Sequence, residues 1–170
     1  GLGDALPIRD HVIEELAHGA HGSIVGAGTV LDADTARSVI SAGGQVIVCP
    51  TFNPDVVEVA VRHDVAVVPG CLTPTEMDTA MRLGATAVKI FPAGSLGARY
   101  LSDLHGPFPD IPLVPSGGIS ASNAAEYLAH GAAAVTAGTS VVTPALVADG
   151  RWTHITERAA EFVTNIGNTP

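Results

Sequence analysis

One lysine in this sequence stands where an amine could do covalent chemistry. Lys89 is the only lysine among the 170 residues, and it lies in the apolar stretch AVKIF. Burial disfavours a charged ammonium and therefore lowers the pKa of a lysine in such a stretch. A neutral amine near pH 7 attacks carbonyl carbons and can form a Schiff base. The alternative is a strand-end lysine whose amine reaches solvent or contacts a phosphate without forming a bond.

Two glycine-rich segments could bind a phosphate group. PSGGIS spans residues 115–120 and AGTS spans residues 137–140, and each follows an apolar run. A helix N-terminus after such a segment presents unpaired N–H groups and a partial positive charge. The tandem segments predict a phosphate site, although glycines can also serve only to permit tight turns. A third segment, GAGT at 26–29, lacks the last glycine of a dinucleotide-binding loop and is predicted to expose Thr29.

Short apolar runs, interpreted as strands, alternate with segments that carry helix signals. The predicted strands are 23–26, 45–49, 65–69, 87–91, 112–115 and 133–137. These runs are apolar throughout, which is typical of parallel strands covered on both faces by helices. The alternation predicts an α/β fold with a parallel sheet.

Capping residues mark the helices between these strands. Asp32 and Asn53 are predicted N-caps, and a proline follows Asn53 at the first helical position. The sequence TPTE at 73–76 predicts a capping box. Ser120 is predicted to open a helix that closes at Gly131.

The order of elements predicts an incomplete barrel. Residues 4–19 have helical spacing, but no strand precedes them in this sequence. Six strands and 170 residues fall short of the eight strands and roughly 200–250 residues of a (β/α)8 barrel. We therefore expect one domain over residues 1–170, a (β/α)8 TIM barrel whose first β–α unit and second strand are absent.

Composition argues against several kinds of partner. The net charge is −9 with no basic cluster, which disfavours nucleic acid and anionic membranes, and no apolar run approaches the roughly 18 residues that span a bilayer. Two cysteines, Cys49 and Cys71, are too few for a disulfide framework and predict reduced thiols in the cytoplasm. His18 and His21 each precede a glycine, and no other cluster has ligand spacing, so no metal is predicted.

Four segments together resemble the KDPG/KHG aldolase family. They are IVGAGTVLDADTARSVISAGGQVIVCP, VVPGCLTPTE, AVKIFPAGSLG and PLVPSGGISASN, and the likeness runs from about residue 24 to residue 142. Members of that family are (β/α)8 barrels, commonly homotrimers. They are class I lyases that need no cofactor and cleave 2-keto-3-deoxy-6-phosphogluconate to pyruvate and glyceraldehyde 3-phosphate.

The resemblance implies a role for each matching residue. Lys89 would form the Schiff base. The residues that would line the pyruvate pocket are Thr29, Pro50 and Phe91. Those that would border the substrate hydroxyls and the phosphate are Ser116, Gly117, Gly118 and Ser140. The implied phosphate region therefore coincides with the two glycine-rich segments.

The sequence departs from the family at the general acid/base. The family carries a glutamate near the end of its second strand, in a segment of the type E-x-T-x-R, and no such segment exists here. Glu14 and Glu15 lie within a predicted helix, and Glu76 belongs to the predicted capping box. We assign no general base and expect a functional polypeptide that is longer at its N-terminus by roughly two strands and a helix.

The prediction is a class I aldolase acting on phosphorylated keto-deoxy sugar acids. Two alternatives stay open: a phosphosugar isomerase or synthase barrel in which Lys89 binds charge without covalency, and a non-catalytic phosphate-ligand binder. The sequence does not fix the configuration at C4 of the substrate, which separates the gluconate series from the galactonate series.

Overall fold

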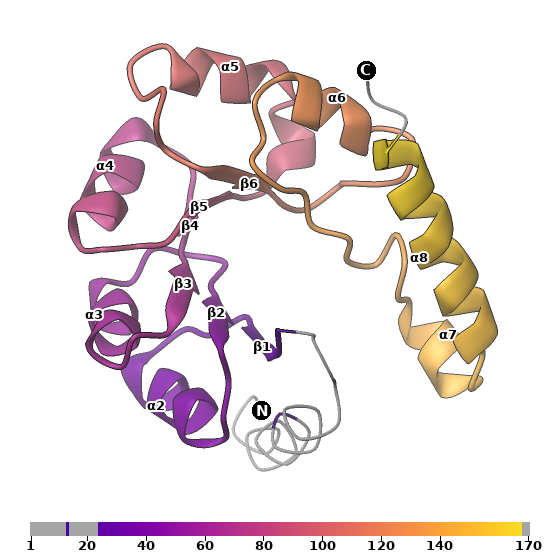
Figure 1. Cartoon of the computed structure of the whole chain (residues 1–170), viewed down its shortest axis with the longest axis horizontal. Coiled ribbons are helices and arrows are strands. Elements are labelled where there is room, and N and C mark those ends of the chain that lie inside the picture. Colours follow the sequence, from indigo (N-terminus) through magenta and orange to yellow (C-terminus); the bar gives the residue numbers. More distant parts are fainter. Residues whose placement is uncertain (1–12, 14–23, 168–170) are drawn as a thin grey trace. The chain divides into compact units, whose positions relative to one another are not determined.

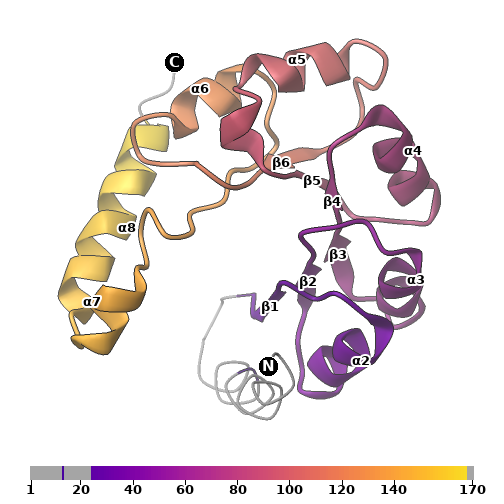
Figure 2. The same cartoon turned by 180° about the vertical axis from the view of Figure 1, so that it is seen from behind.

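The computed structural model describes residue 13 and residues 24–167. The chain divides into two compact units, Gly1–Lys89 and Ile90–Pro170. In the first unit, short strands alternate along the chain with helices, as Figures 1 and 2 show from opposite sides. This alternation, with parallel pairing between strands, confirms the α/β class expected from the sequence. Within the described residues, no helix is long and apolar enough to cross a membrane.

The first unit contains a three-stranded parallel sheet. Its elements are β1 (Gly26–Gly28), α2 (Ala33–Ser41), β2 (Val46–Val48), α3 (Pro54–Arg62), β3 (Ala66–Val68), β4 (Gly70–Cys71) and α4 (Pro74–Arg82), and β5 (Val88–Ile90) follows at the boundary of the two units. The strand order is β1-β2-β3, with Gly26 opposite Val46 and Val46 opposite Ala66. The backbone N–H of Lys89 donates to the carbonyl of Pro69 at 2.9 Å and so joins β5 to the residue between β3 and β4.

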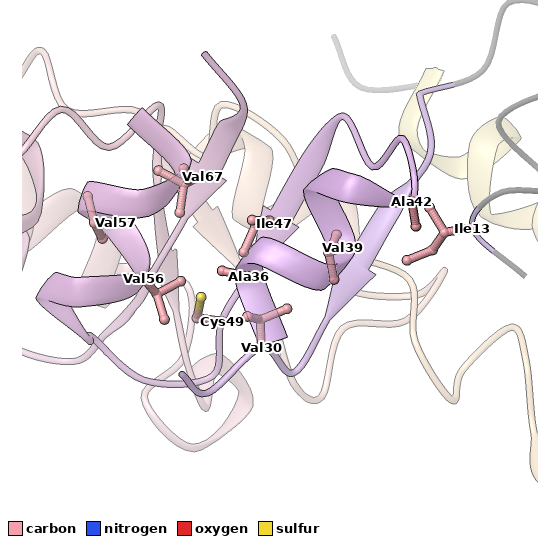
Figure 3. Packing of buried hydrophobic residues seen from close by; sticks show 11 residues of the cluster. Ile13, Val30, Ala36, Val39, Ala42, Ile47, Cys49, Val56, Val57 and Val67 are labelled. Carbon is pink, nitrogen blue, oxygen red and sulfur yellow. The ribbon is translucent and has the colours of Figure 1, made fainter. Parts of the chain in front are cut away.

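The core of the first unit lies between its sheet and helices α2 and α3 (Figure 3). Ile47 of β2 is fully buried, whereas Val46 and Val48 beside it are half-buried. That alternation places one face of the strand against the helices. The other buried members of the cluster are Ile13, Val30, Ala36, Val39, Ala42, Cys49, Val56, Val57, Ala60 and Val67.

The predicted caps form as hydrogen-bonded structures. The carboxylate of Asp32 accepts from the N–H of Thr35 at 2.7 Å, and the amide oxygen of Asn53 accepts from the N–H of Asp55 at 3.0 Å. In the capping box, the hydroxyl of Thr73 accepts from the N–H of Glu76, and the Glu76 carboxylate accepts from the N–H of Thr73. These bonds satisfy N–H groups that the first turn of a helix leaves without partners.

The strand β6 (Leu113–Pro115) lies in the second unit. The further elements of this unit are the 3-10 helix η2 (Ala93–Ser95), α5 (Arg99–His105), α6 (Ala124–Ala129), α7 (Pro144–Ala148) and α8 (Trp152–Gly167). The N–H of Ser116 donates to the carbonyl of Ile90 at 3.0 Å, so β6 continues beside the end of β5. Helix α8 packs beside α6, where the Asn165 amide donates to the carbonyl of Ala121 at 3.1 Å.

The predicted strand at 133–137 does not form. Ala133 donates to the carbonyl of Leu113 at 2.9 Å and Thr136 to that of Pro115 at 3.3 Å, so the segment does run beside β6. A regular parallel ladder would use residues two apart on both strands. Here the acceptors Leu113 and Pro115 are two positions apart, whereas the donors Ala133 and Thr136 are three positions apart. The extra residue on the donor side breaks the ladder.

Two other boundaries were also wrong. β1 spans Gly26–Gly28 and overlaps the predicted strand 23–26 only at Gly26. A Cβ at Gly26 would collide with the carbonyl of Val46, so glycine permits the close pairing there, although its low strand propensity argued against a strand. The helix that follows the first glycine-rich segment, α6, begins at Ala124 and not directly after Ser120. The side chain of Asn123 holds the intervening residues in a turn.

We expect Thr73→Ala to lower the free energy of unfolding by about 1 kcal/mol, because the variant leaves an N–H of the first turn of α4 without its acceptor. Chemical denaturation of the two proteins measures the difference. Thr75→Ala is the matched control, because Thr75 is exposed and its side chain does not cap the helix. Equal losses in both variants would contradict the cap.

Candidate active site

Lys89 lies on β5 with its amine half-buried. Its neighbours Val88 and Ile90 are fully buried, so Lys89 projects from the opposite face of the strand. Burial lowers the pKa of the Lys89 amine, and the nearby Cys49 thiol, in its charged form, opposes this effect. The result is a larger fraction of neutral amine at a given pH than an exposed lysine has.

The two cysteines near this strand are free and buried. Burial raises the pKa of Cys49 to about 11 and that of Cys71 to about 12. Both thiols are therefore protonated at neutral pH and are poor nucleophiles. A neutral Cys49 also supplies no negative charge that would hold Lys89 as an ammonium.

Thr29 and Pro50 follow the first two strands of the sheet. Thr29 comes directly after β1, is exposed, and has a φ of 59°. This left-handed conformation is unfavourable for a β-branched residue and costs about 1–2 kcal/mol. Pro50 comes two residues after β2, and its carbonyl packs so closely on Gly70 that a Cβ there would collide with it. In a parallel sheet, residues that follow neighbouring strands share one edge.

Phe91 packs on the first glycine-rich segment. Its side chain is 38% exposed, and a Cβ added at Gly117 would lie 3.0 Å from its ring. Gly117 and Gly118 both have a φ of 81°, a conformation that favours glycine. The structure thus brings Phe91 together with Ser116, Gly117 and Gly118 within the second unit.

Gly94, which the sequence did not single out, fits against the same segment. Its N–H donates to the carbonyl of Gly117 at 2.8 Å, and the N–H of Ala93 donates to the carbonyl of Ser116 at 2.8 Å. A Cβ at Gly94 would lie 3.1 Å from the oxygen of Gly117 and from the Cα of Gly118. Glycine at 94 therefore allows two backbone segments to touch.

Several hydrogen-bonding groups of the two glycine-rich segments remain available. Among the described residues, the N–H groups of Gly117 and Gly118 have no protein acceptor, and neither do those of residues 138–140. The hydroxyl of Ser140 is buried without a hydrogen-bond partner. Thr136 donates through its N–H and its hydroxyl to the carbonyl of Pro115, so the two segments leave the sheet side by side. Buried polar groups without partners indicate a place for a polar ligand.

Of the carboxylates named from the sequence, the structure describes Glu76, and it serves in a helix cap and not as a general base. Glu76 accepts from the N–H groups of Leu72 at 2.9 Å and Thr73 at 2.8 Å, and these bonds lower its pKa. Its carboxylate is therefore engaged in the cap of α4. Glu14 and Glu15 lie outside the described residues, as do His18 and His21. In the described part of the chain, no group of three or more histidine, cysteine or acidic side chains is placed to hold a metal ion.

A family model described as "KDPG and KHG aldolase" matches residues 7–158. The chain belongs to the KDPG/KHG aldolase family. It is 36% identical over 145 residues to the 2-dehydro-3-deoxy-phosphogluconate aldolase of Treponema pallidum. The aligned region covers 85% of this chain and 69% of that protein. It is also 38% identical over 112 residues to the 2-dehydro-3-deoxy-6-phosphogalactonate aldolase of Escherichia coli K12. That alignment covers 65% of this chain and 55% of the relative.

A solved structure of the family matches the fold. It is a crystal structure of KDPG aldolase from Legionella pneumophila with pyruvate captured at low pH as a covalent carbinolamine intermediate. The TM-score is 0.82 at 25% identity, and the match covers 96% of this chain and 77% of that one. The family expected from the sequence is confirmed.

We expect Thr29→Gly to keep or raise the free energy of unfolding, because glycine relieves the left-handed backbone of Thr29. Thr51→Gly is the control, because Thr51 is exposed and lacks a positive φ; it should lose about 0.4–1 kcal/mol from the added freedom of the unfolded chain. Denaturant titrations compare the three proteins. A loss in Thr29→Gly as large as in the control would show that residue 29 stores no strain.

Proposed function

We propose that this chain is a class I aldolase that cleaves a phosphorylated 2-keto-3-deoxy sugar acid to pyruvate and glyceraldehyde 3-phosphate. The observation that carries the proposal is the half-buried Lys89 amine with a lowered pKa, in a chain of the KDPG/KHG aldolase family. The covalent capture of pyruvate in the Legionella relative supports the same chemistry. The protein is accordingly a lyase.

The reaction begins when the neutral amine of Lys89 attacks the C2 ketone and water leaves, which gives a protonated imine. A base removes the proton of the C4 hydroxyl, the C3–C4 bond breaks, and the aldehyde departs. The bonding electrons enter the iminium and form an enamine of pyruvate. Protonation at C3 and addition of water then release pyruvate and restore the amine. The imine itself is the electron sink of this route.

We assign the remaining site residues from the resemblance to the family. The residues proposed to line the pyruvate pocket are Thr29, Pro50 and Phe91. Those proposed to border the hydroxyls and the phosphate are Ser116, Gly117, Gly118 and Ser140. The N–H groups of the two glycine-rich segments that have no acceptor among the described residues support the phosphate assignment, and so does the buried Ser140 hydroxyl without a partner.

Architecture and assembly are proposed at the level of the family. The alternation of strands and helices and the likeness to the Legionella aldolase support a single (β/α)8 barrel domain. The homotrimer follows from the family resemblance. The free, buried thiols support a cytoplasmic location. The substrate class is assigned without its C4 configuration, because relatives named for the gluconate and the galactonate series both match.

We expect pyruvate and borohydride to add one covalent adduct, which disappears in Lys89→Ala. Since Lys89 is the only lysine among these 170 residues, peptide mapping after intact-mass analysis assigns a lysine adduct in this part of the chain to Lys89. Lys89→Arg is the matched variant that keeps a positive charge and cannot form the imine. Circular dichroism checks that both variants fold.

Two outcomes of the trapping experiment would contradict the proposal. An adduct of undiminished size in Lys89→Ala would remove Lys89 from the mechanism. Failure of the wild type to form any adduct would favour a barrel that binds phosphosugars without a covalent step, or a protein that binds a phosphate ligand without catalysis.

We expect Lys89 to titrate below the ordinary lysine pKa of about 10.4. Because burial disfavours the ammonium, the neutral form appears at lower pH, and labelling by acetic anhydride should rise and level off earlier than for a lysine peptide. Quantitative mass spectrometry of the Lys89 peptide across a pH series gives the midpoint. A midpoint at or above that of the free peptide would show that burial does not tune the amine.

A further inference from the structure

We propose that Asn123 and Tyr127 are positioning residues that hold the peptide groups of the Ser116–Gly118 segment in the orientation that binds phosphate. The inference rests on the proposed function, since it concerns how the proposed phosphate site is built. Both residues come from one short stretch of chain: Asn123 is the N-cap residue of α6, and Tyr127 lies within that helix.

The carbonyls of this segment are all taken by the protein. The carbonyl of Ser116 accepts from the N–H of Ala93 at 2.8 Å, and that of Gly117 accepts from the N–H of Gly94 at 2.8 Å. The carbonyl of Gly118 accepts from the side-chain amide of Asn123 at 2.9 Å. Three consecutive carbonyls therefore point into the protein.

This arrangement fixes where the N–H groups point. In a trans peptide, the carbonyl of one residue and the N–H of the next point in opposite directions. The anchored carbonyls of residues 116–118 therefore direct the N–H groups of Gly117, Gly118 and Ile119 away from their anchors. Among the described residues, none of these three N–H groups has a protein acceptor. Successive backbone N–H groups on one side of a loop form a concavity that binds anions.

Asn123 closes the segment with both ends of its amide. Its oxygen accepts from the N–H of Ser120 at 2.8 Å while its nitrogen donates to the carbonyl of Gly118. A single side chain thus sets the peptide planes on either side of Ile119. Without the donor, the peptide that follows Gly118 loses its only anchor among the described residues and can turn its carbonyl toward the ligand.

Tyr127 contacts the Ser116–Gly118 segment only indirectly, through Ala93. Its side chain is 3% exposed, and its hydroxyl donates to the carbonyl of Ala93 at 3.1 Å. Ala93 and Gly94 supply the N–H groups that anchor Ser116 and Gly117. Burial raises the pKa of Tyr127, so the phenol keeps the proton that it donates. Tyr127 therefore holds the segment at Ala93 and Gly94, and that segment holds the carbonyls of Ser116 and Gly117.

The test uses two variants that each remove one hydrogen bond at nearly constant shape. Tyr127→Phe loses only the hydroxyl. Asn123→Asp replaces the donor to Gly118 by a carboxylate oxygen, keeps an acceptor for Ser120 and adds a negative charge, which the control below also adds. The matched control is Asn165→Asp, which loses a similar amide donor to a backbone carbonyl, that of Ala121, in the same unit. Steady-state cleavage is measured with the phosphorylated substrate and with its unphosphorylated counterpart, alongside borohydride trapping of pyruvate.

We expect kcat/KM for the phosphorylated substrate to fall about tenfold in both variants, mainly through KM, with changes under roughly twofold for the unphosphorylated one. Pyruvate trapping and the control should stay at wild-type levels. Equal losses on both substrates, or a similar phosphate-specific loss in Asn165→Asp, would overturn the positioning role while normal trapping still upheld the aldolase. Wild-type protein that forms no pyruvate adduct would instead overturn the proposed function, and this inference with it.

Discussion

Burial of one amine is the constraint on which the proposed chemistry depends. An ammonium loses hydration when it enters an apolar strand, and the loss is expressed as a lowered pKa of Lys89. The strand imposes this environment because Val88 and Ile90 pack fully into the interior and leave Lys89 on the other face. The charge state of the neighbours matters as much as burial itself. Cys49 is the residue whose charge opposes the shift, and its own burial keeps its thiol protonated at neutral pH.

The proposed phosphate site in the second unit requires positive potential, and backbone N–H groups are the groups proposed to supply it. The chain carries a net charge of −9, so a phosphorylated substrate has to be attracted by local groups. Backbone N–H groups serve this purpose when their carbonyl partners are occupied elsewhere. The contacts of Ala93, Gly94 and Asn123 to three successive carbonyls create that condition. Glycine is favoured at 117 and 118 by a φ of 81°, and a Cβ at 94, 117 or 118 would lie within 3.0–3.1 Å of a neighbouring atom.

The helix caps show why much of this protein could be predicted from its sequence. Each is a local feature: the hydrogen bond joins residues two or three positions apart, so the residue types identify it directly. Four of the six predicted strands also contain the observed β2, β3, β5 and β6, because buried parallel strands read as apolar runs. Lys89 stood out for the same reason, as a single charge within such a run. The general base, in contrast, has no matching segment in this sequence.

The sequence by itself determined the α/β class, the helix caps, the apolar setting of Lys89 and the family. Only the tertiary structure decided which residues contact the glycine-rich segments from distant positions in the sequence. Tyr127 reads as an ordinary core aromatic until its hydroxyl meets the carbonyl of Ala93, 34 positions away. The segment at 133–137 has strand-like composition, but its register against β6 contains an extra residue and a regular ladder does not form. Such features depend on the register and the contacts between distant segments, which composition and local spacing do not encode.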